Sequence, residues 1–171
     1  MSYWLFQIMY KWFPESWGIM VNKGIAAQHY PLEEKWTNSG RNNKALERLH
    51  KGDYIVAAFK RHRFAGYGKL TSNFNSNRKG VESLDITDSR WRQDYKAGFF
   101  ERFNCDWTVI PLNRDQVFID CGDLAIPVPG KKMLKDIDLL RGCCVKEIEK
   151  PVFDKLKDRL DKNGAIPHYR H

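Results

Sequence analysis

The pattern of hydrophobic and polar positions is clearest between residues 53 and 70. Two apolar runs, Tyr54–Phe59 and Phe64–Leu70, flank a short basic break. The first run is rich in β-forming residues, and the second contains Gly66 and Gly68, which suit a strand that bends or lies against another backbone. We therefore expect two antiparallel strands joined by a short basic turn.

The rest of the chain predicts more short strands and a few helices. Further strands are expected at residues 1–9, 17–21 and 103–112, with residues 116–120 pairing to the last of these. Residues 25–31 are expected to be irregular or briefly helical. Helices are expected after an Asn42 or Asn43 cap, over 131–141 and over 151–160, and the last carries a clear apolar stripe: Val152, Phe153, Leu156 and Leu160.

Length and pattern together favour one domain. The chain has 171 residues, 42% of them hydrophobic, and no linker long enough to separate two units. We expect a single domain over 1–171, with a core at about 2–160 and a polar, frayed tail at 161–171. Strands dominate the middle, so the expected fold class is α+β, with a small curved or barrel-like sheet and short helices packed outside it.

The charge balance points to a polyanionic partner. Lys and Arg exceed Asp and Glu by 29 to 21, a net charge of +8, which raises the odds of nucleic-acid binding. The four cysteines contain no C-x-x-C pair, so reduced, mostly buried thiols in a cytoplasmic protein are expected. No apolar run reaches membrane-spanning length, and the N-terminus lacks the pattern of a signal peptide.

Motifs for catalysis or cofactor binding are missing. The sequence has no Walker A loop, H-E-x-x-H, G-x-S-x-G or G-x-G-x-x-G. The triplets Asp94-Tyr-Lys96 and Glu33-Glu-Lys35 match half of a nuclease metal site, but neither follows a strand with an upstream Asp. We therefore expect no catalytic residue, no metal and no cofactor.

Aromatic residues fall into two groups by their neighbours. Trp4 and Trp107 lie in apolar strands and are expected in the core. Trp36, Trp91 and Tyr95 sit instead among polar and charged residues. Each of these three rings either folds back to cap the core or offers a stacking platform, where a base gains about 1–3 kcal/mol.

Three motifs in order resemble YTH domains, which read N6-methyladenine. Trp36-Thr-Asn-Ser-Gly, followed by Asn43-Lys-Ala-Leu46, resembles their Trp-Ser-Thr…Gly-Asn-x-x-Leu signature. Phe64-Ala-Gly-Tyr-Gly-Lys resembles their Phe-x-Gly-x-Ala-x-Met strand. Trp91-Arg-Gln-Asp-Tyr-Lys-Ala-Gly-Phe-Phe, followed by Phe103-Asn-Cys-Asp-Trp107, resembles their Trp-x-x-Asp-Lys-Trp-x-Gly-x-Phe-x-Val-x-Trp block. Ser2-Tyr-Trp-Leu and Asn22 look more like EVE domains of the same PUA-like superfamily.

The resemblance implies a PUA-like β-barrel that binds a modified base in an aromatic cage. Trp36 and Trp91 match two cage positions, and Tyr95 falls one residue from the third. Contacts to the base edge are then expected from three polar residues: Asn22, Thr37 and Asn38. For phosphate contacts the candidates are the basic residues of two loops, each of which is otherwise a solvated charge: Lys60, Arg61, Arg63, Arg78 and Lys79.

The functional interpretation is a binding module for nucleic acid carrying a methylated or otherwise modified base. EVE and YTH-like modules also serve as DNA-reading domains of McrB-type restriction systems, so flipped-out DNA is favoured, with an attached NTPase or nuclease module as a further partner. Three alternatives stay open: a YTH-type reader of RNA, an enzyme such as a nuclease or RNA-modification factor, and a protein-interaction domain with an incidental basic surface.

Overall fold

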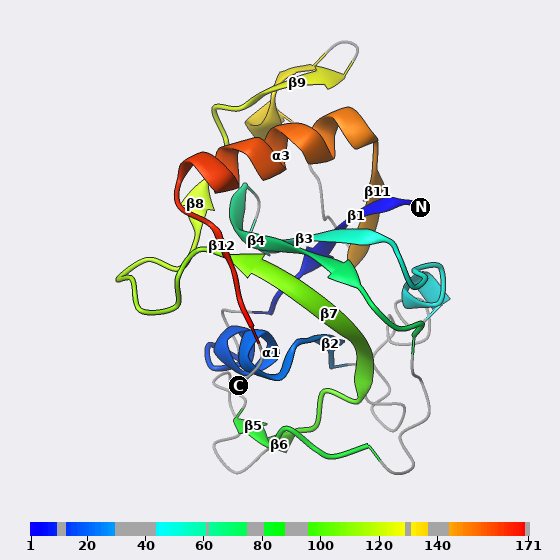
Figure 1. The fold of residues 1–171 in the computed structure, drawn as a ribbon. Coiled ribbons are helices and arrows are strands. Elements are labelled where there is room, and N and C mark those ends of the chain that lie inside the picture. Colours follow the sequence, from blue (N-terminus) through cyan, green and yellow to red (C-terminus); the bar gives the residue numbers. More distant parts are fainter. Residues whose placement is uncertain are drawn as a thin grey trace.

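The computed structural model describes residues 1–9, 13–29, 44–60, 62–74, 81–87, 96–128, 131–136 and 144–169. Residues 44–46 are helical. The other elements follow one another in Figure 1 in this order: β1 (Tyr3–Gln7), α1 (Ser16–Lys23), β2 (Ile25–Gln28), β3 (Tyr54–Lys60), β4 (Arg63–Leu70), β5 (Ile86–Thr87), β6 (Lys96–Ala97), β7 (Glu101–Val109), β8 (Ile119–Asp120), β9 (Ala125–Val128), β10 (Lys131–Met133), the 3-10 helix η1 (Leu134–Asp136), β11 (Val145–Ile148), α3 (Lys150–Lys162) and β12 (Ile166–Pro167).

Eight of the described strands form one curled sheet. Its main order is β11-β1-β3-β4-β7-β12, with β2 added to β7 and β8 added to β4. β1 and β3 run parallel, and the neighbouring pairs are antiparallel. Figure 1 shows α3 lying across the sheet near β4 and β8, and α1 at the opposite side near β2. The predicted fold class is confirmed: an α+β domain with a small curved sheet and short helices outside it.

The predicted hairpin is confirmed as β3 and β4, and its glycines have the expected role. A Cβ on Gly66 would lie 2.5 Å from the carbonyl oxygen of Thr108 and 2.9 Å from Cα of Val109. A Cβ on Gly68 would collide with Sγ of Cys105. β4 therefore approaches β7 so closely that only glycine fits at these two positions.

Two apolar clusters fill the two sides of the sheet. The inner one contains Trp4, Trp17 and Trp107, and it lies within the curl, where α1 packs. The second lies under α3, whose predicted apolar stripe is fully buried against it. Trp4 and Trp107 are each 2% exposed, so their prediction as core residues is confirmed.

The described cysteines, Cys105, Cys121 and Cys144, are buried and unbridged, as expected. Burial raises the pKa of the Cys121 thiol to about 12, which makes it a poor nucleophile at neutral pH. These thiols serve as small apolar side chains.

The prediction of a strand at 17–21 is wrong, because these residues belong to α1. Trp17, Met20 and Val21 are buried together on one face, the spacing of a helix. Gly24 ends the helix with φ 62°, and its N–H donates to the carbonyl oxygens of Met20 and Val21. A five-residue apolar run fits either periodicity, and the glycine cap decides between them.

Two strands differ from expectation near the middle of the chain. Residues 25–28, expected to be irregular or helical, form β2 on β7. The strand at 116–120 was predicted to pair with β7. Ile119–Asp120 pairs instead with Arg63–Phe64 of β4. β7 covers β4 only from Gly66 onward, so the first residues of β4 have an open edge that β8 fills.

The C-terminal third also differs from prediction. Where a helix was expected over 131–141, Lys131–Met133 pairs with β9 and Leu134–Asp136 forms the 3-10 helix η1, while residues 137–141 lie outside the described residues. The tail does not fray through residue 168. Ile166–Pro167 pairs with β7, and the N–H of His168 donates to the carbonyl of Trp107 over 2.9 Å.

Candidate nucleic-acid interface

The end of β1, the start of α1 and the end of β2 meet at one place. β1 and β2 are not neighbours in the sheet order, but the Gln28 amide Nε2 donates to the carbonyl of Gln7 and joins them. We call this place the β1–β2 corner and define it by six residues: Gln7, Phe13, Ser16, Gln28, His29 and Phe99.

Three rings pack together at the corner. The ring centroids are 5.1 Å apart for Phe13 and Phe99, 5.8 Å for Phe13 and His29, and 5.4 Å for His29 and Phe99. They connect the chain before α1, the end of β2 and the chain before β7. Mutual packing of this kind fixes the relative positions of three segments that are distant in the sequence.

Phe99 is held in an uncommon backbone conformation, with φ 52°. The Arg102 side chain braces this turn: Nε donates to the Phe99 carbonyl over 2.6 Å and Nη2 to the Gly98 carbonyl over 3.1 Å. Desolvation of its guanidinium lowers the pKa of Arg102 from its usual value, with nearby Glu82 and Glu101 acting in the opposite direction. A strained residue braced in this way is typical of a site that must hold its shape.

The corner contains buried polar atoms that find no partner in the described part of the chain. Oγ of Ser16 and Oε1 of Gln28 are fully buried, and neither makes a hydrogen bond there. An unpaired buried polar group costs about 1–3 kcal/mol. Such atoms are candidates for contacts to the polar edge of a ligand.

The segments that carry Trp36 and Trp91 both leave the described structure at this corner. Residues 30–43 begin directly after His29. Residues 88–95 connect β5 to β6, which pair through Ile86 and Ala97, and the Leu84 N–H donates to the Gly98 carbonyl over 3.1 Å. Gly98 precedes Phe99, whose ring lies against His29, so the two segments share one attachment region.

Most predicted site residues fall outside the described residues, and their predictions stay untested. These are the three cage residues and five of their polar or basic companions: Trp36, Trp91, Tyr95, Thr37, Asn38, Arg61, Arg78 and Lys79. Lys60 is the last residue of β3. Asn22 and Arg63 have described side chains.

Asn22 lies apart from the corner. It is exposed near the last residue of α1, whereas Ser16 begins the helix. A rise of 1.5 Å per residue puts about 9 Å along the helix axis between the two. Asn22 therefore lies at the opposite end of α1 from Ser16, and its predicted contact to the base edge stays a prediction.

Arg63 is exposed at the tip of the β3–β4 hairpin, where it pairs with Lys60 across the turn. Its guanidinium lies over the Phe118 ring, 5.2 Å from the centroid. β1 and β3 are parallel, and the Ile8 N–H donates to the Ala58 carbonyl over 2.8 Å. The basic tip and the end of β1 therefore lie at the same end of the sheet.

The sequence alone did not indicate the roles of Gln28 and Ser16. The only signal is a polar residue closing the apolar run Gly24-Ile-Ala-Ala-Gln28. The burial of Gln28 and the lack of a donor to its Oε1 depend on tertiary packing, which no local pattern reports.

The described ranges contain no group of three His, Cys, Asp or Glu side chains placed to hold a metal ion. No helix within them is long and apolar enough to cross a membrane.

Comparison with known proteins gave likenesses to solved structures only. No family model matches the chain, and no curated protein matches it by sequence. One similar structure is the YTH domain of the Zygosaccharomyces rouxii MRB1 protein in complex with N6-methyladenosine RNA, with a TM-score of 0.47, 17% identity, and coverage of 98% of this chain and 90% of that one. Another is protein Atu2648 from Agrobacterium tumefaciens, with a TM-score of 0.49, 13% identity, and coverage of 96% and 94%. At these values neither likeness assigns a function.

Proposed function

We propose that this chain is a nucleic-acid-binding module that recognises a modified base. The base leaves its strand and enters a cage formed by Trp36 and Trp91, with Tyr95 as the third wall. Thr37 and Asn38 lie on the same segment as Trp36 and contact the base edge. The basic hairpin tip, with Arg63, holds the phosphate backbone.

One observation carries the proposal: the two segments that bear Trp36 and Trp91 start from the same corner. Trp36 lies seven residues after His29, and Trp91 lies four residues after Thr87. A chain spans at most about 3.5 Å per residue, so these rings lie within about 25 Å and 14 Å of their attachment points. Both rings can reach the corner, where strained Phe99 and the unpaired polar atoms already lie.

The energetics of such a cage favour a methylated base. Stacking contributes about 1–3 kcal/mol per base, which offsets the few kcal/mol needed to unstack a nucleotide from a duplex. A methyl group adds about 0.8 kcal/mol when its surface is buried in a dry site. The cage therefore distinguishes methylated from unmethylated bases by roughly tenfold, unless polar contacts add to the difference.

The sequence resemblance favours DNA as the polymer and cytoplasmic modification-dependent restriction as the context, with an attached NTPase or nuclease module. RNA is the alternative polymer. Binding by a cage requires a base that is free of its duplex partner, and both single-stranded RNA and flipped DNA satisfy that requirement.

The deciding experiment is a binding panel on the protein as it stands. Fluorescence anisotropy with matched oligonucleotides compares unmodified, N6-methyladenine, 5-methylcytosine and 5-hydroxymethylcytosine versions, as DNA and RNA, single and double stranded. At least one modified oligonucleotide should bind about tenfold more tightly than its unmodified twin, without divalent ions. Equal affinity for the modified and unmodified members of every pair contradicts the proposal. The polymer that binds most tightly identifies the substrate class.

A further inference from the structure

We propose that a cavity between β7 and the end of β12 binds a guanine base, with Asp106 as the residue that selects guanine. We call this cavity the β7–β12 pocket. It shares no residue with the β1–β2 corner, so this inference goes beyond the proposed function and does not depend on the modified-base cage. The base belongs either to a free nucleotide or to a single nucleic-acid strand, and its recognition chemistry is the same in both.

The pocket has a volume of about 290 Å³ and is lined by residues 105–108 of β7 and residues 167–169 at the end of β12. Figure 1 shows β12 running alongside β7. On the edge of β7 that faces away from β4, β2 pairs only as far as Asn104 and β12 only from Thr108. No strand of the described chain covers the residues between them, so this edge is open there. A cavity of this size suits one base and not a larger ligand.

The register of β12 on β7 brings an aromatic ring beside a carboxylate. The N–H of His168, just after β12, donates to the carbonyl of Trp107 over 2.9 Å, so the antiparallel register continues beyond the strand. One residue further, Tyr169 lies opposite Asp106, and directly opposed side chains lie on the same face of a sheet. Tyr169 is 76% exposed, and both residues line the pocket.

The carboxylate of Asp106 is available to a ligand. Its side chain is exposed, and it makes no hydrogen bond or ion pair with the described part of the chain. Lys69 is its cross-strand neighbour on β4, but the Lys69 ammonium lies over the Tyr54 ring, 5.7 Å from the centroid. Both carboxylate oxygens of Asp106 are therefore free acceptors at the wall of the pocket.

Two free acceptor oxygens match guanine among the bases. Guanine presents two adjacent donors on its Watson–Crick edge, N1–H and the 2-amino group, and one carboxylate can accept from both. Adenine and cytosine place a ring-nitrogen acceptor beside their amino group, and uracil and thymine place their single N–H between two carbonyl oxygens. Each of these arrangements sets an acceptor against the carboxylate. The Tyr169 ring supplies a face on which the base stacks.

Two other occupants fit the pocket less well. An added β-strand needs N–H donors on the outer edge of β12, but Pro167 has no N–H to offer there. An arginine side chain could also pair with the carboxylate. However, the Trp107 N–H lies on the same edge of β7 as the Trp107 carbonyl, and a guanidinium has no acceptor for it, whereas a base has several. The net charge of +8 also favours a polyanion over a basic partner.

The first test varies the ligand on the wild-type protein. The 5′-monophosphates of guanosine, inosine and adenosine share ribose and phosphate, and inosine lacks only the 2-amino group of guanosine. Titrations followed by proton–nitrogen NMR report both affinity and location. Guanosine monophosphate should shift the amide signals of residues 105–108 and 168–169. It should bind about tenfold more tightly than the inosine and adenosine monophosphates, because they leave a carboxylate oxygen unpaired.

The second test varies the protein. Asp106→Asn keeps the size of the side chain and replaces one acceptor oxygen by a donor, and Asp115→Asn is the matched control at an exposed position outside the pocket. Asp106→Asn should lose the guanosine-over-inosine preference, whereas Asp115→Asn should keep it. Tyr169→Ala should weaken all three nucleotides alike, because it removes the stacking face and not the edge contact. Thermal melts establish that the variants fold.

Three outcomes overturn the inference. One is equal affinity of the wild type for the guanosine and inosine monophosphates, and another is a set of guanosine shifts that leaves out residues 105–108 and 168–169. The third is a folded Asp106→Asn variant that keeps the preference. N-acetylarginine amide is the probe for the rival occupant, and tighter binding of this probe than of guanosine monophosphate at the pocket also contradicts a base site.

A further arm distinguishes the two sources of the base. An oligothymidine strand with one guanosine should bind more tightly than guanosine monophosphate if the base belongs to a strand, and no more tightly if it belongs to a free nucleotide. None of these measurements involves a modified base. Failure of the modified-base panel therefore leaves this inference standing, and failure of this inference leaves the proposed function standing.

Discussion

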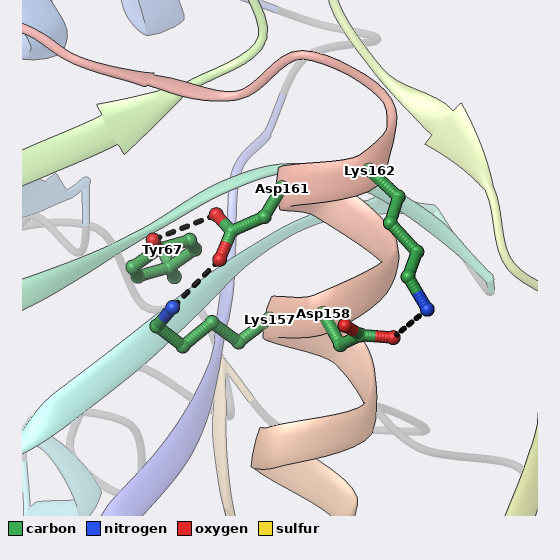
Figure 2. A network of polar contacts seen from close by, with 5 residues as sticks. All are labelled: Tyr67, Lys157, Asp158, Asp161 and Lys162. Carbon is green, nitrogen blue, oxygen red and sulfur yellow. Dashed lines mark hydrogen bonds and ion pairs between the residues drawn. The ribbon is translucent and has the colours of Figure 1, made fainter.

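The face of the sheet under α3 and the β1–β2 corner differ in whether their polar groups have hydrogen-bond partners. Beside α3 the Tyr67 hydroxyl donates to Oδ1 of Asp161 over 2.8 Å, and Nζ of Lys157 donates to Oδ2 over 2.6 Å. Figure 2 shows the Asp161 carboxylate between these two donors. At the corner, Ser16 and Gln28 hold buried polar atoms without partners in the described structure.

The apolar packing follows the same division. Under α3, Phe153 sits among three tyrosine rings, with centroids 4.8 Å from Tyr3, 5.3 Å from Tyr54 and 6.2 Å from Tyr67. The cluster packs under α3, and the outer surface of this helix carries ion pairs such as Lys157–Asp161. We infer that the α3 face supplies stability and that the corner holds the functional groups at a cost to stability.

The largest expected effect comes from emptying the centre of the α3 face. Phe153→Ala should lower the free energy of unfolding by about 3–5 kcal/mol, because it leaves a cavity among three rings. Affinity for the preferred oligonucleotide, measured well below the melting temperature, should stay within twofold. Lys155→Ala on the exposed side of α3 is the control and should change stability by less than about 0.5 kcal/mol. A large affinity loss in folded Phe153→Ala would show that the two regions are coupled.

The reverse pattern is expected at the proposed cage. Trp36→Ala and Trp91→Ala should each weaken binding to the modified base by about 1–3 kcal/mol, because stacking is lost, and leave the melting temperature nearly unchanged. Trp107→Ala serves as the control. Its ring is 2% exposed and its Nε1 donates to the Ile25 carbonyl over 2.8 Å, so it should destabilise by about 3–5 kcal/mol. Oligonucleotide titrations and thermal melts of each variant distinguish the two roles. If the Trp36 and Trp91 variants melt at a temperature as low as that of Trp107→Ala and still prefer the modified base, these rings are part of the core.

A smaller effect is expected at the hairpin tip. If Arg63 contacts phosphate, Arg63→Ala should reduce the slope of log affinity against log salt by roughly one unit and weaken modified and unmodified sites alike. Lys155→Ala removes one positive charge from α3 and should leave the slope unchanged. Anisotropy titrations from low to moderate salt measure both. Equal slopes in the two variants would remove Arg63 from the interface.

The smallest effect concerns the pH dependence of the α3 face. Burial, with the Asp161 hydrogen bond, raises the pKa of Tyr67 above its usual 10.0, and the Asp161 hydrogen bond raises the pKa of Lys157 above 10.5. Raised values mean that both groups stabilise the fold below their unfolded pKa values, and that this contribution is lost as pH rises through the folded ones. Solvent screening keeps it below about 1 kcal/mol.

Tyr67→Phe tests this contribution. The variant should be slightly less stable than the wild type at pH 8, and the difference should be smaller at pH 12, because the stability from a group with a raised pKa is lost as pH rises through that pKa. Urea denaturation at both pH values measures it. A difference that is the same at both pH values would mean that the hydroxyl bond to Asp161 does not contribute.

The sequence predicted the elements whose signals are local. The β3–β4 hairpin follows from β-forming residues on either side of a basic turn, and α3 follows from Pro151 in the first turn and a stripe at helical spacing. α1 was mistaken for a strand because Trp17-Gly-Ile-Met-Val21 is too short for periodicity to decide. β12 was missed because main-chain hydrogen bonds hold it, while Ile166 is 53% exposed.

The candidate site was less accessible to sequence reasoning. The motif-bearing aromatic rings were found by resemblance and lie outside the described residues, so their cage stays a prediction. Gln28 and Ser16 could not be found, because an unpaired buried atom is a property of the packed fold. Asn22 was selected from a resemblance at a position that the structure places at the far end of α1.

The central position of β1 has a consequence for synthesis on the ribosome. β1, formed by the first residues of the chain, lies between β3 and β11, and β11 comes after residue 144. β7 likewise obtains its partner β12 only at Ile166–Pro167. The sheet cannot be completed until residues 145–167 have left the ribosome, and contacts of such high sequence separation slow folding. We therefore expect the emerging N-terminal half to depend on holding chaperones until β11 and β12 are available, with cooperative closure of the sheet as the last step.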